Sequence, residues 1–167
     1  MAKIDVGDKA PEFELAGTGE KTYRLSDYSK SGVILAFYPG DFTAVCTKQF
    51  CSYRDNADGI DGLGIPVLGI SPQSVESHER WAEEQRLNVP LLADEDMKVA
   101  KAYGVTGWGS PLAWLAERKA VTPAGFFTQR AIFVVDGGGI VRYRQASFTG
   151  STFQGVDELR QAVSALA

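Results

Sequence analysis

The two cysteines of this chain, Cys46 and Cys51, are the residues whose type and spacing best suit chemistry. They lie in the segment PGDFTAVCTKQFC, directly after an apolar run at residues 33–38. The run is rich in β-branched and aromatic residues and stops at Pro-Gly, which predicts a buried strand followed by a turn and a helix. Cys46 then lies near a helix N-terminus, where unpaired backbone N–H groups and the helix dipole favour an anion. A thiolate is an anion, so this position favours a nucleophilic sulfur.

The five-residue spacing between Cys46 and Cys51 limits how the two sulfurs can react with each other. On one regular helix, two Cα atoms five residues apart are separated by roughly 8.6 Å. A disulfide tolerates at most about 6.8 Å between its two Cα atoms. The spacing therefore predicts two thiols that meet only when the first turns of the helix unwind, rather than a static structural disulfide.

The residues around the first cysteine resemble a known family signature. Pro39, Thr43 and Cys46 reproduce the P-x-x-x-T-x-x-C pattern of the peroxiredoxins. Cys51 resembles the resolving cysteine of the bacterioferritin-comigratory (PrxQ) subfamily, and Arg130 sits where the family has its active-site arginine. The resemblance implies that Thr43 and Arg130 bind the peroxide or the thiolate and that Pro39 shields the nucleophile.

The resemblance extends over nearly the whole chain. It covers the segments DKAPEF, LSDY, VLGIS, SVESH, LLAD, AKAYGV and RAIFVVD. Two positions depart from the common pattern. Gln49 stands where many relatives carry Glu, and Ala44 replaces a proline that often follows the threonine. Neither change removes a reacting group, although the neutral Gln49 removes one carboxylate near the thiolate.

The resemblance also implies an activity and its partners. A peroxiredoxin of this subfamily is a thiol peroxidase that reduces hydrogen peroxide and organic hydroperoxides. Cys46 attacks the peroxide and becomes a sulfenic acid, and Cys51 resolves it as an intramolecular disulfide. A dithiol protein of the thioredoxin type then reduces the disulfide. Because sulfur carries the electrons, we expect no bound cofactor. We expect a monomer, with a dimer left open.

The elements that must position these residues alternate along the chain. The patterns predict strands at 33–38, 66–70, 131–135 and 140–145, and helices at 43–59, 74–85, 96–103 and 156–166. The segment DGGG at 136–139 predicts a hairpin turn. This alternation predicts one α/β domain over residues 1–167 with a central mixed sheet flanked by helices. The family resemblance implies the thioredoxin-like fold with an N-terminal β-hairpin extension.

Composition excludes several other classes of function. The formal charge of −4, with no basic cluster, argues against a nucleic-acid partner. The sequence contains no apolar run long enough for a membrane span and no signal-peptide pattern at its start, so we expect a cytoplasmic protein. Two cysteines and one histidine, His78, do not match the spacing of a zinc site, so we expect no metal.

Several alternatives stay open at this point. The cysteine pair could serve a non-enzymatic redox sensor or holdase, or a disulfide oxidoreductase, although the C-x-x-x-x-C spacing counts against the latter. A cysteine hydrolase would need His78 as its base, yet charged neighbours on its helix predict a solvated face for that residue. The aromatic and glycine-rich region 106–128 predicts a structured loop with a short helix at 112–118, which could also wall the peroxide pocket or contact a partner.

Overall fold

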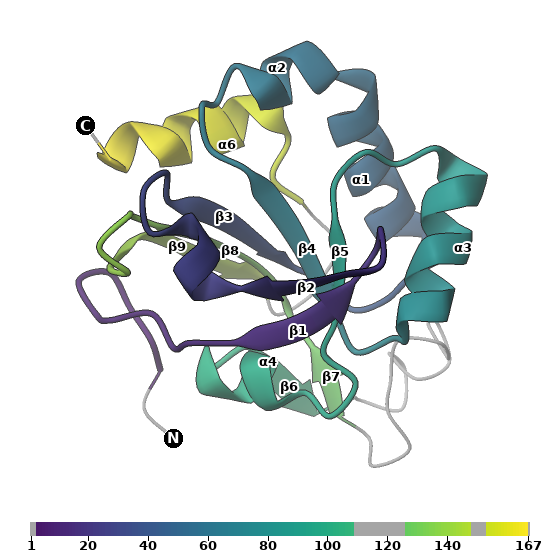
Figure 1. The fold of residues 1–167 in the computed structure, drawn as a ribbon, viewed down its shortest axis with the longest axis horizontal. Helices are drawn as coiled ribbons and strands as arrows, with labels where there is room; N and C mark the ends of the chain where they lie inside the picture. Colours follow the sequence, from purple (N-terminus) through teal and green to yellow (C-terminus); the bar gives the residue numbers. More distant parts are fainter. Residues whose placement is uncertain (1–2, 109–125, 148–152, 167) are drawn as a thin grey trace.

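The computed structural model describes residues 3–108, 126–147 and 153–166. Within these residues the main feature is a seven-stranded sheet in the order β2-β1-β5-β4-β3-β8-β9, with a separate two-stranded sheet formed by β6 and β7. The strands of the main sheet are β1 (Glu14–Gly17), β2 (Lys21–Arg24), β3 (Val33–Phe37), β4 (Val67–Ser71), β5 (Leu91–Ala93), β8 (Arg130–Val135) and β9 (Val141–Ser147). Figure 1 shows the sheet running through the middle of the molecule with helices on either side.

The helices follow the predicted pattern with one difference. They are α1 (Ala44–Asp55), α2 (Ala57–Asp61), α3 (Val75–Gln85), α4 (Lys98–Ala102) and α6 (Val156–Val163), with 3-10 turns η1 (Leu25–Tyr28) and η2 (Ser164–Leu166). The helix predicted at 43–59 is two helices, because the backbone of Asn56 leaves the helical region with φ −115° and ψ 41°. The side chain of Ser74 caps α3 by accepting a hydrogen bond from the Ser77 N–H.

The sheet is mixed, as predicted. Strand β3 lies parallel to β4, β4 lies parallel to β5, and β8 lies antiparallel to β3. All five residues of β3 are buried, which explains why its sequence is apolar throughout instead of alternating. The predicted turn at 136–139 joins β8 to β9, with Gly139 at φ +79°.

The N-terminal hairpin of β1 and β2 is present and extends the same sheet. Gly17 at the end of β1 pairs with Leu92 of β5. A side chain at Gly17 would meet the Tyr23 ring at 2.7 Å and the Leu91 carbonyl at 2.8 Å, so only glycine allows this close approach.

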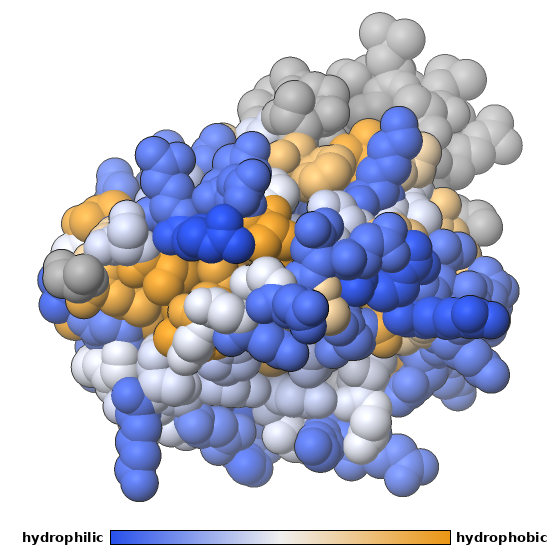
Figure 2. Space-filling model, turned by 90° about the horizontal axis from the view of Figure 1, so that it is seen from above, coloured by the Kyte–Doolittle hydropathy of each residue, from blue (hydrophilic) through white to orange (hydrophobic). Residues whose placement is uncertain are grey.

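Two apolar layers cover the two faces of the sheet. Val33, Leu35 and Phe37 of β3 belong to a core with residues of η1 and α4, whereas Ile34 and Ala36 belong to a core with residues of α1, α3 and α6. The alternation along β3 thus assigns each face its own helices. Helix α1 lies on the second face beside α3 (Figure 1), and α6 contributes to the same core. The face seen in Figure 2 is mainly polar, with an apolar patch toward one side.

Part of the region at 106–128 forms strands that the sequence pattern does not reveal. Strands β6 (Thr106–Trp108) and β7 (Phe126–Thr128) pair antiparallel. The short helix predicted at 112–118 lies outside the described residues. In the described parts of the chain, no helix is long and apolar enough to cross a membrane.

Candidate active site

The junction between β3 and α1 places Cys46 at the start of a helix, as predicted. The strand ends at Phe37, a buried turn follows, and Thr43 occupies the N-cap position with an extended backbone. Cys46 is the third residue of α1 and is 0% exposed. It therefore lies in the first helical turn, where backbone N–H groups lack helical partners and the dipole favours a negative charge.

Thr43 does not cap the helix with its side chain. Its hydroxyl donates instead to the Gly40 carbonyl across the turn, with an O···O distance of 2.9 Å. A hydroxyl has one proton and two lone pairs, so Thr43 keeps the capacity to accept a hydrogen bond from a bound ligand. This contact fixes the side chain within the turn that leads to Cys46.

Arg130 reaches Cys46 because of the strand register, although the two residues are far apart in sequence. Phe37 pairs with Ala131, so Arg130 lies level with the residue that follows β3, at the edge where α1 begins. The Arg130 side chain is 1% exposed, and its Nη2 atom donates to the Cys46 sulfur at 3.1 Å. A buried guanidinium in contact with the sulfur stabilises the thiolate form.

The same guanidinium is held by a chain of buried hydrogen bonds along α1. Arg130 Nη1 donates to the Gln49 side-chain carbonyl. The Gln49 amide donates to the Tyr53 hydroxyl at 2.9 Å, and that hydroxyl donates to the Gln154 carbonyl at 2.7 Å. Burial raises the pKa of Tyr53 above its ordinary value, so it stays a neutral donor. The neutral Gln49 therefore replaces a charge pair with an orienting hydrogen bond.

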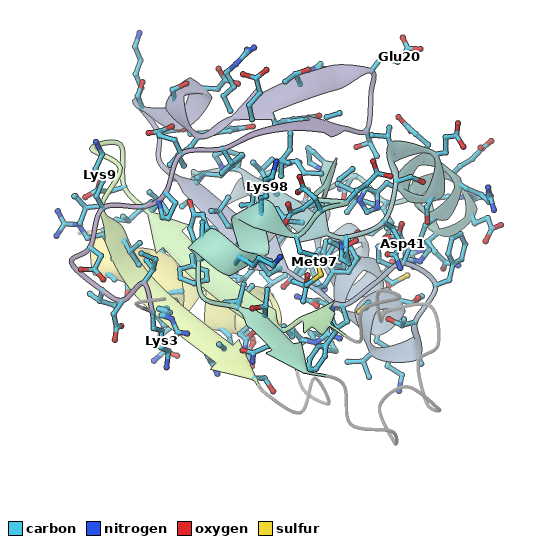
Figure 3. All side chains as sticks on the ribbon, turned by 90° about the horizontal axis from the view of Figure 1, so that it is seen from below. Lys3, Lys9, Glu20, Asp41, Met97 and Lys98 are labelled. Atoms are coloured by element: carbon cyan, nitrogen blue, oxygen red, sulfur yellow. The ribbon has the colours of Figure 1, made fainter. Side chains whose placement is uncertain are left out.

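A second buried network lies behind the turn, and it corrects the prediction for His78. The His78 side chain is 0% exposed, not solvated; its Nδ1 atom lies 2.7 Å from Asp41 Oδ2 and its Nε2 atom 3.0 Å from the Leu92 carbonyl. Tyr38 donates to the other Asp41 oxygen at 2.7 Å. Burial, with the Asp41 carboxylate beside it, raises the pKa of Tyr38 well above its ordinary value. Asp41 lies between α1 and α3 in Figure 3.

This network also removes the hydrolase alternative. Both ring nitrogens of His78 are directed at Asp41 and Leu92, so neither is available to take a proton from Cys46. The Tyr38 hydroxyl lies 3.3 Å from His78 Nδ1 and completes the buried cluster. The described residues contain no group of three or more His, Cys, Asp or Glu side chains arranged to hold a metal ion.

Cys51 lies on the same helix in a much looser setting. It is half-buried, and its thiol contacts the Gln85 side-chain oxygen at 3.5 Å. Arg54, one turn further along, donates to the Gln85 backbone carbonyl and so joins α1 to the last residue of α3. Both cysteines are free and both lie within the intact helix α1. Pro39 is buried in the turn, and its shielding role stays a prediction.

The comparison with protein families decides what kind of chain this is. The model of the AhpC/TSA family matches residues 6–144, which is most of the chain. The chain belongs to the AhpC/TSA family.

Relatives of this AhpC/TSA protein carry peroxiredoxin names. It is 39% identical to Peroxiredoxin Bcp of Bacillus subtilis over 102 residues, which are 61% of this chain and 65% of the relative. It is 40% identical to Peroxiredoxin Bcp of Escherichia coli over 109 residues, which are 65% of this chain and 69% of the relative. The matched part therefore spans about two thirds of each relative's length.

A solved structure gives the same family a matching fold. The crystal structure of Peroxidoxin BcpB from Mycobacterium tuberculosis superposes with a TM-score of 0.76 and 28% identity, covering 98% of this chain and 96% of that one. The predicted thioredoxin-like α/β fold is thereby confirmed. The resemblance to the Bcp and PrxQ group is confirmed as well.

Sequence reasoning missed three contributors to this AhpC/TSA site, namely Asp41, His78 and Tyr38. A signal for His78 was present, because Trp81 follows it by three residues and so shares its helix face. Both side chains are 0% exposed. Asp41 gave no comparable signal, since an aspartate after Pro-Gly is an ordinary turn residue.

Proposed function

We propose that this AhpC/TSA family member is a thiol peroxidase that reduces hydrogen peroxide and small organic hydroperoxides. The observation that carries the proposal is the 3.1 Å contact between Arg130 Nη2 and the Cys46 sulfur in the first turn of α1. A guanidinium and a helix N-terminus together favour a thiolate, which is the form of sulfur that attacks peroxides. The peroxiredoxin names of the relatives support the same activity.

In the first step the Cys46 thiolate attacks the terminal peroxide oxygen. A sulfur–oxygen bond forms, the oxygen–oxygen bond breaks, and the leaving oxygen takes a proton to become water or an alcohol. Arg130 has donors beside the sulfur, whereas the Thr43 hydroxyl, whose proton is donated to Gly40, can accept a hydrogen bond from the peroxide. Donors directed at the leaving oxygen stabilise the negative charge that develops on it. The enzyme is left with a sulfenic acid at Cys46.

In the second step Cys51 resolves the sulfenic acid. Its sulfur attacks the Cys46 sulfur, a disulfide forms as the sulfur–oxygen bond breaks, and the leaving hydroxide takes the proton given up by the Cys51 thiol to become water. Because the two residues lie on one helix, their Cα atoms are roughly 8.6 Å apart, beyond the reach of a disulfide. We therefore infer that α1 opens locally between the two steps, and that the looser surroundings of Cys51 make this possible.

In the third step a dithiol protein of the thioredoxin class returns the two electrons by thiol–disulfide exchange. No bound cofactor takes part. The scheme needs one chain only, so we propose a monomer. Reduction by such a partner also suits a reducing compartment, which leads us to propose the cytoplasm.

The proposal is tested by peroxide consumption coupled to thioredoxin and its reductase, with several hydroperoxides as substrates. We expect repeated turnover in the wild type and none in Cys46→Ser, whereas a redox sensor would react once and stop. Full activity in Cys46→Ser would overturn the assignment.

The resolving step has its own test. Cys51→Ser should consume one equivalent of peroxide and then fail to turn over with thioredoxin. Mass spectrometry of the oxidised wild type should show a bridge between Cys46 and Cys51 within one chain. A bridge between two chains would contradict the intramolecular scheme and the proposed monomer.

A further inference from the structure

The turn that leads into α1 is strained. Phe42 has a φ of +63°, in the left-handed region that a bulky residue adopts only when its surroundings impose it. It lies between Asp41 and Thr43, directly before the helix that carries Cys46. Without other contacts the turn would relax, and both the Thr43 hydroxyl and the first turn of the helix would shift with it.

Asp41 is the residue that holds this turn. It is 1% exposed, and three side chains surround its carboxylate: Tyr38 Oη at 2.7 Å, Ser77 Oγ at 2.8 Å and His78 Nδ1 at 2.7 Å. The Asp41 backbone N–H donates to the Gln73 side-chain oxygen at 2.5 Å. Ser77 and His78 belong to α3, Tyr38 directly follows β3 and Gln73 precedes α3, so the turn is fixed to both elements.

The hydrogen bonds of His78 determine where its protons are. The Leu92 carbonyl can only accept, so Nε2 carries a proton. The Asp41 carboxyl group accepts from Tyr38 and Ser77, and its Oδ2 atom lies 2.7 Å from His78 Nδ1. A buried polar group of this kind needs partners for its lone pairs, so the two side chains hold each other in place.

We propose that His78 is a positioning residue for the peroxide reaction. Anchored to the Leu92 carbonyl, it holds Asp41, and Asp41 in turn holds the strained Phe42 turn that sets the start of α1. The reaction it serves is the peroxidase step proposed above, on which this inference rests. His78 touches neither sulfur nor peroxide in this arrangement.

The test compares two substitutions that each keep one of the two hydrogen bonds of the His78 ring. The amide of His78→Asn can reach Asp41 but not Leu92, and the amide of His78→Gln can reach Leu92 but not Asp41. Stopped-flow kinetics measure the rate at which Cys46 reacts with hydrogen peroxide, and urea denaturation measures the stability of each variant. We expect the Gln variant to lose about 10- to 100-fold in rate and the Asn variant to stay within about threefold of wild type, because small displacements of reacting groups are costly.

The control is Val141→Ala, a core residue at the opposite end of the sheet that is 0% exposed. It should lower the urea midpoint and leave the peroxide rate unchanged. Equal rates for the Asn and Gln variants, or rate losses that merely follow the urea midpoint in all three variants, would overturn the positioning role.

A second measurement needs no variant. His78 is the only histidine of the chain, so its ring nitrogens give an unambiguous ¹⁵N NMR signature. We expect the proton on Nε2, which faces the Leu92 carbonyl, to exchange slowly with solvent, and a fast-exchanging Nε2 proton would overturn the buried anchor. This result does not depend on peroxide chemistry. A wild type that shows the slowly exchanging proton but fails to react with peroxide would therefore count against the proposed function and not against the buried pair.

Discussion

The two ends of helix α3 hold the two halves of the reactive segment in different ways. Near its start, His78 and Ser77 contact Asp41 in a fully buried network just before Cys46. At its last residue, Gln85 contacts the half-buried Cys51 thiol at 3.5 Å. The first step of the proposed chemistry needs hydrogen-bond donors that stay in place around Cys46. The second step needs the Cys51 sulfur to move from its position on the helix toward Cys46. One helix therefore supplies a fixed support at one end and a weak one at the other.

The magnitudes separate the two ends clearly. Leaving a buried acceptor without a partner typically costs about 1–3 kcal/mol, and more for a charged group such as a carboxylate. A neutral hydrogen bond contributes about 0.5–1.5 kcal/mol net, and a thiol is a weak donor. Opening of α1 around Cys51 therefore costs much less than release of the Asp41 turn. The difference predicts where the local unwinding begins.

The largest effect should come from Arg130, which belongs to the fixed side. Arg130→Met removes the donor to the Cys46 sulfur and leaves the Gln49 oxygen without this partner. We expect the peroxide rate to fall about 10²- to 10³-fold, which is the usual cost of losing a donor that stabilises developing charge. The matched control is Arg142→Met on β9, whose guanidinium is half-exposed and pairs with Asp136. Equal effects of the two substitutions in stopped-flow kinetics would contradict the assignment of Arg130.

Tyr53 tests how firmly the buried face of α1 is held. Tyr53→Phe leaves both the Gln49 amide and the Gln154 carbonyl short of a partner, at a cost of about 1–3 kcal/mol in the free energy of unfolding. Urea denaturation measures this loss. The control, Tyr143→Phe, removes a hydroxyl that donates to the exposed Gln145 side chain, and it should cost much less. A loss in Tyr53→Phe no larger than that of the control would show that the chain of hydrogen bonds contributes little.

The smallest effect is expected at the end of α3, where Gln85 contacts Cys51. Gln85→Leu keeps the size of the side chain but removes the acceptor that faces Cys51. We expect disulfide formation from the sulfenic acid to accelerate roughly twofold to threefold, with the peroxide rate unchanged. Glu84→Leu introduces the same side chain at the exposed neighbouring position and serves as the control. Slower resolution in Gln85→Leu than in this control would mean that Gln85 assists the reaction and does not restrain it.

The predictable and the unpredictable parts of the site differ in their physical origin. The helix start at Cys46 follows from local rules, namely an apolar run that stops at Pro-Gly. The contact between Arg130 and Cys46 depends on the register of β8 against β3, which no local pattern contains. Only the family resemblance indicated it.

His78 shows how a local pattern can mislead. Its neighbours Glu76, Glu79 and Arg80 are exposed, and they suggested a solvated face. A helix, however, turns by about 100° per residue, so adjacent residues say little about the direction of a side chain. The residue three positions on, Trp81, is buried in the same layer. Burial of a polar ring also depends on partners such as Asp41 and Leu92, which only the tertiary fold brings together.

Hydrogen exchange, followed by mass spectrometry on the reduced and the disulfide-bonded protein, tests the contrast between the two ends most directly. We predict that the peptide around Cys51 loses protection on oxidation, while the peptides that cover the Asp41 turn and the first turn of α3 keep theirs. Equal loss of protection at the Asp41 turn, or unchanged protection around Cys51, would contradict the account that the start of α3 holds the Asp41 turn firmly while its end releases Cys51.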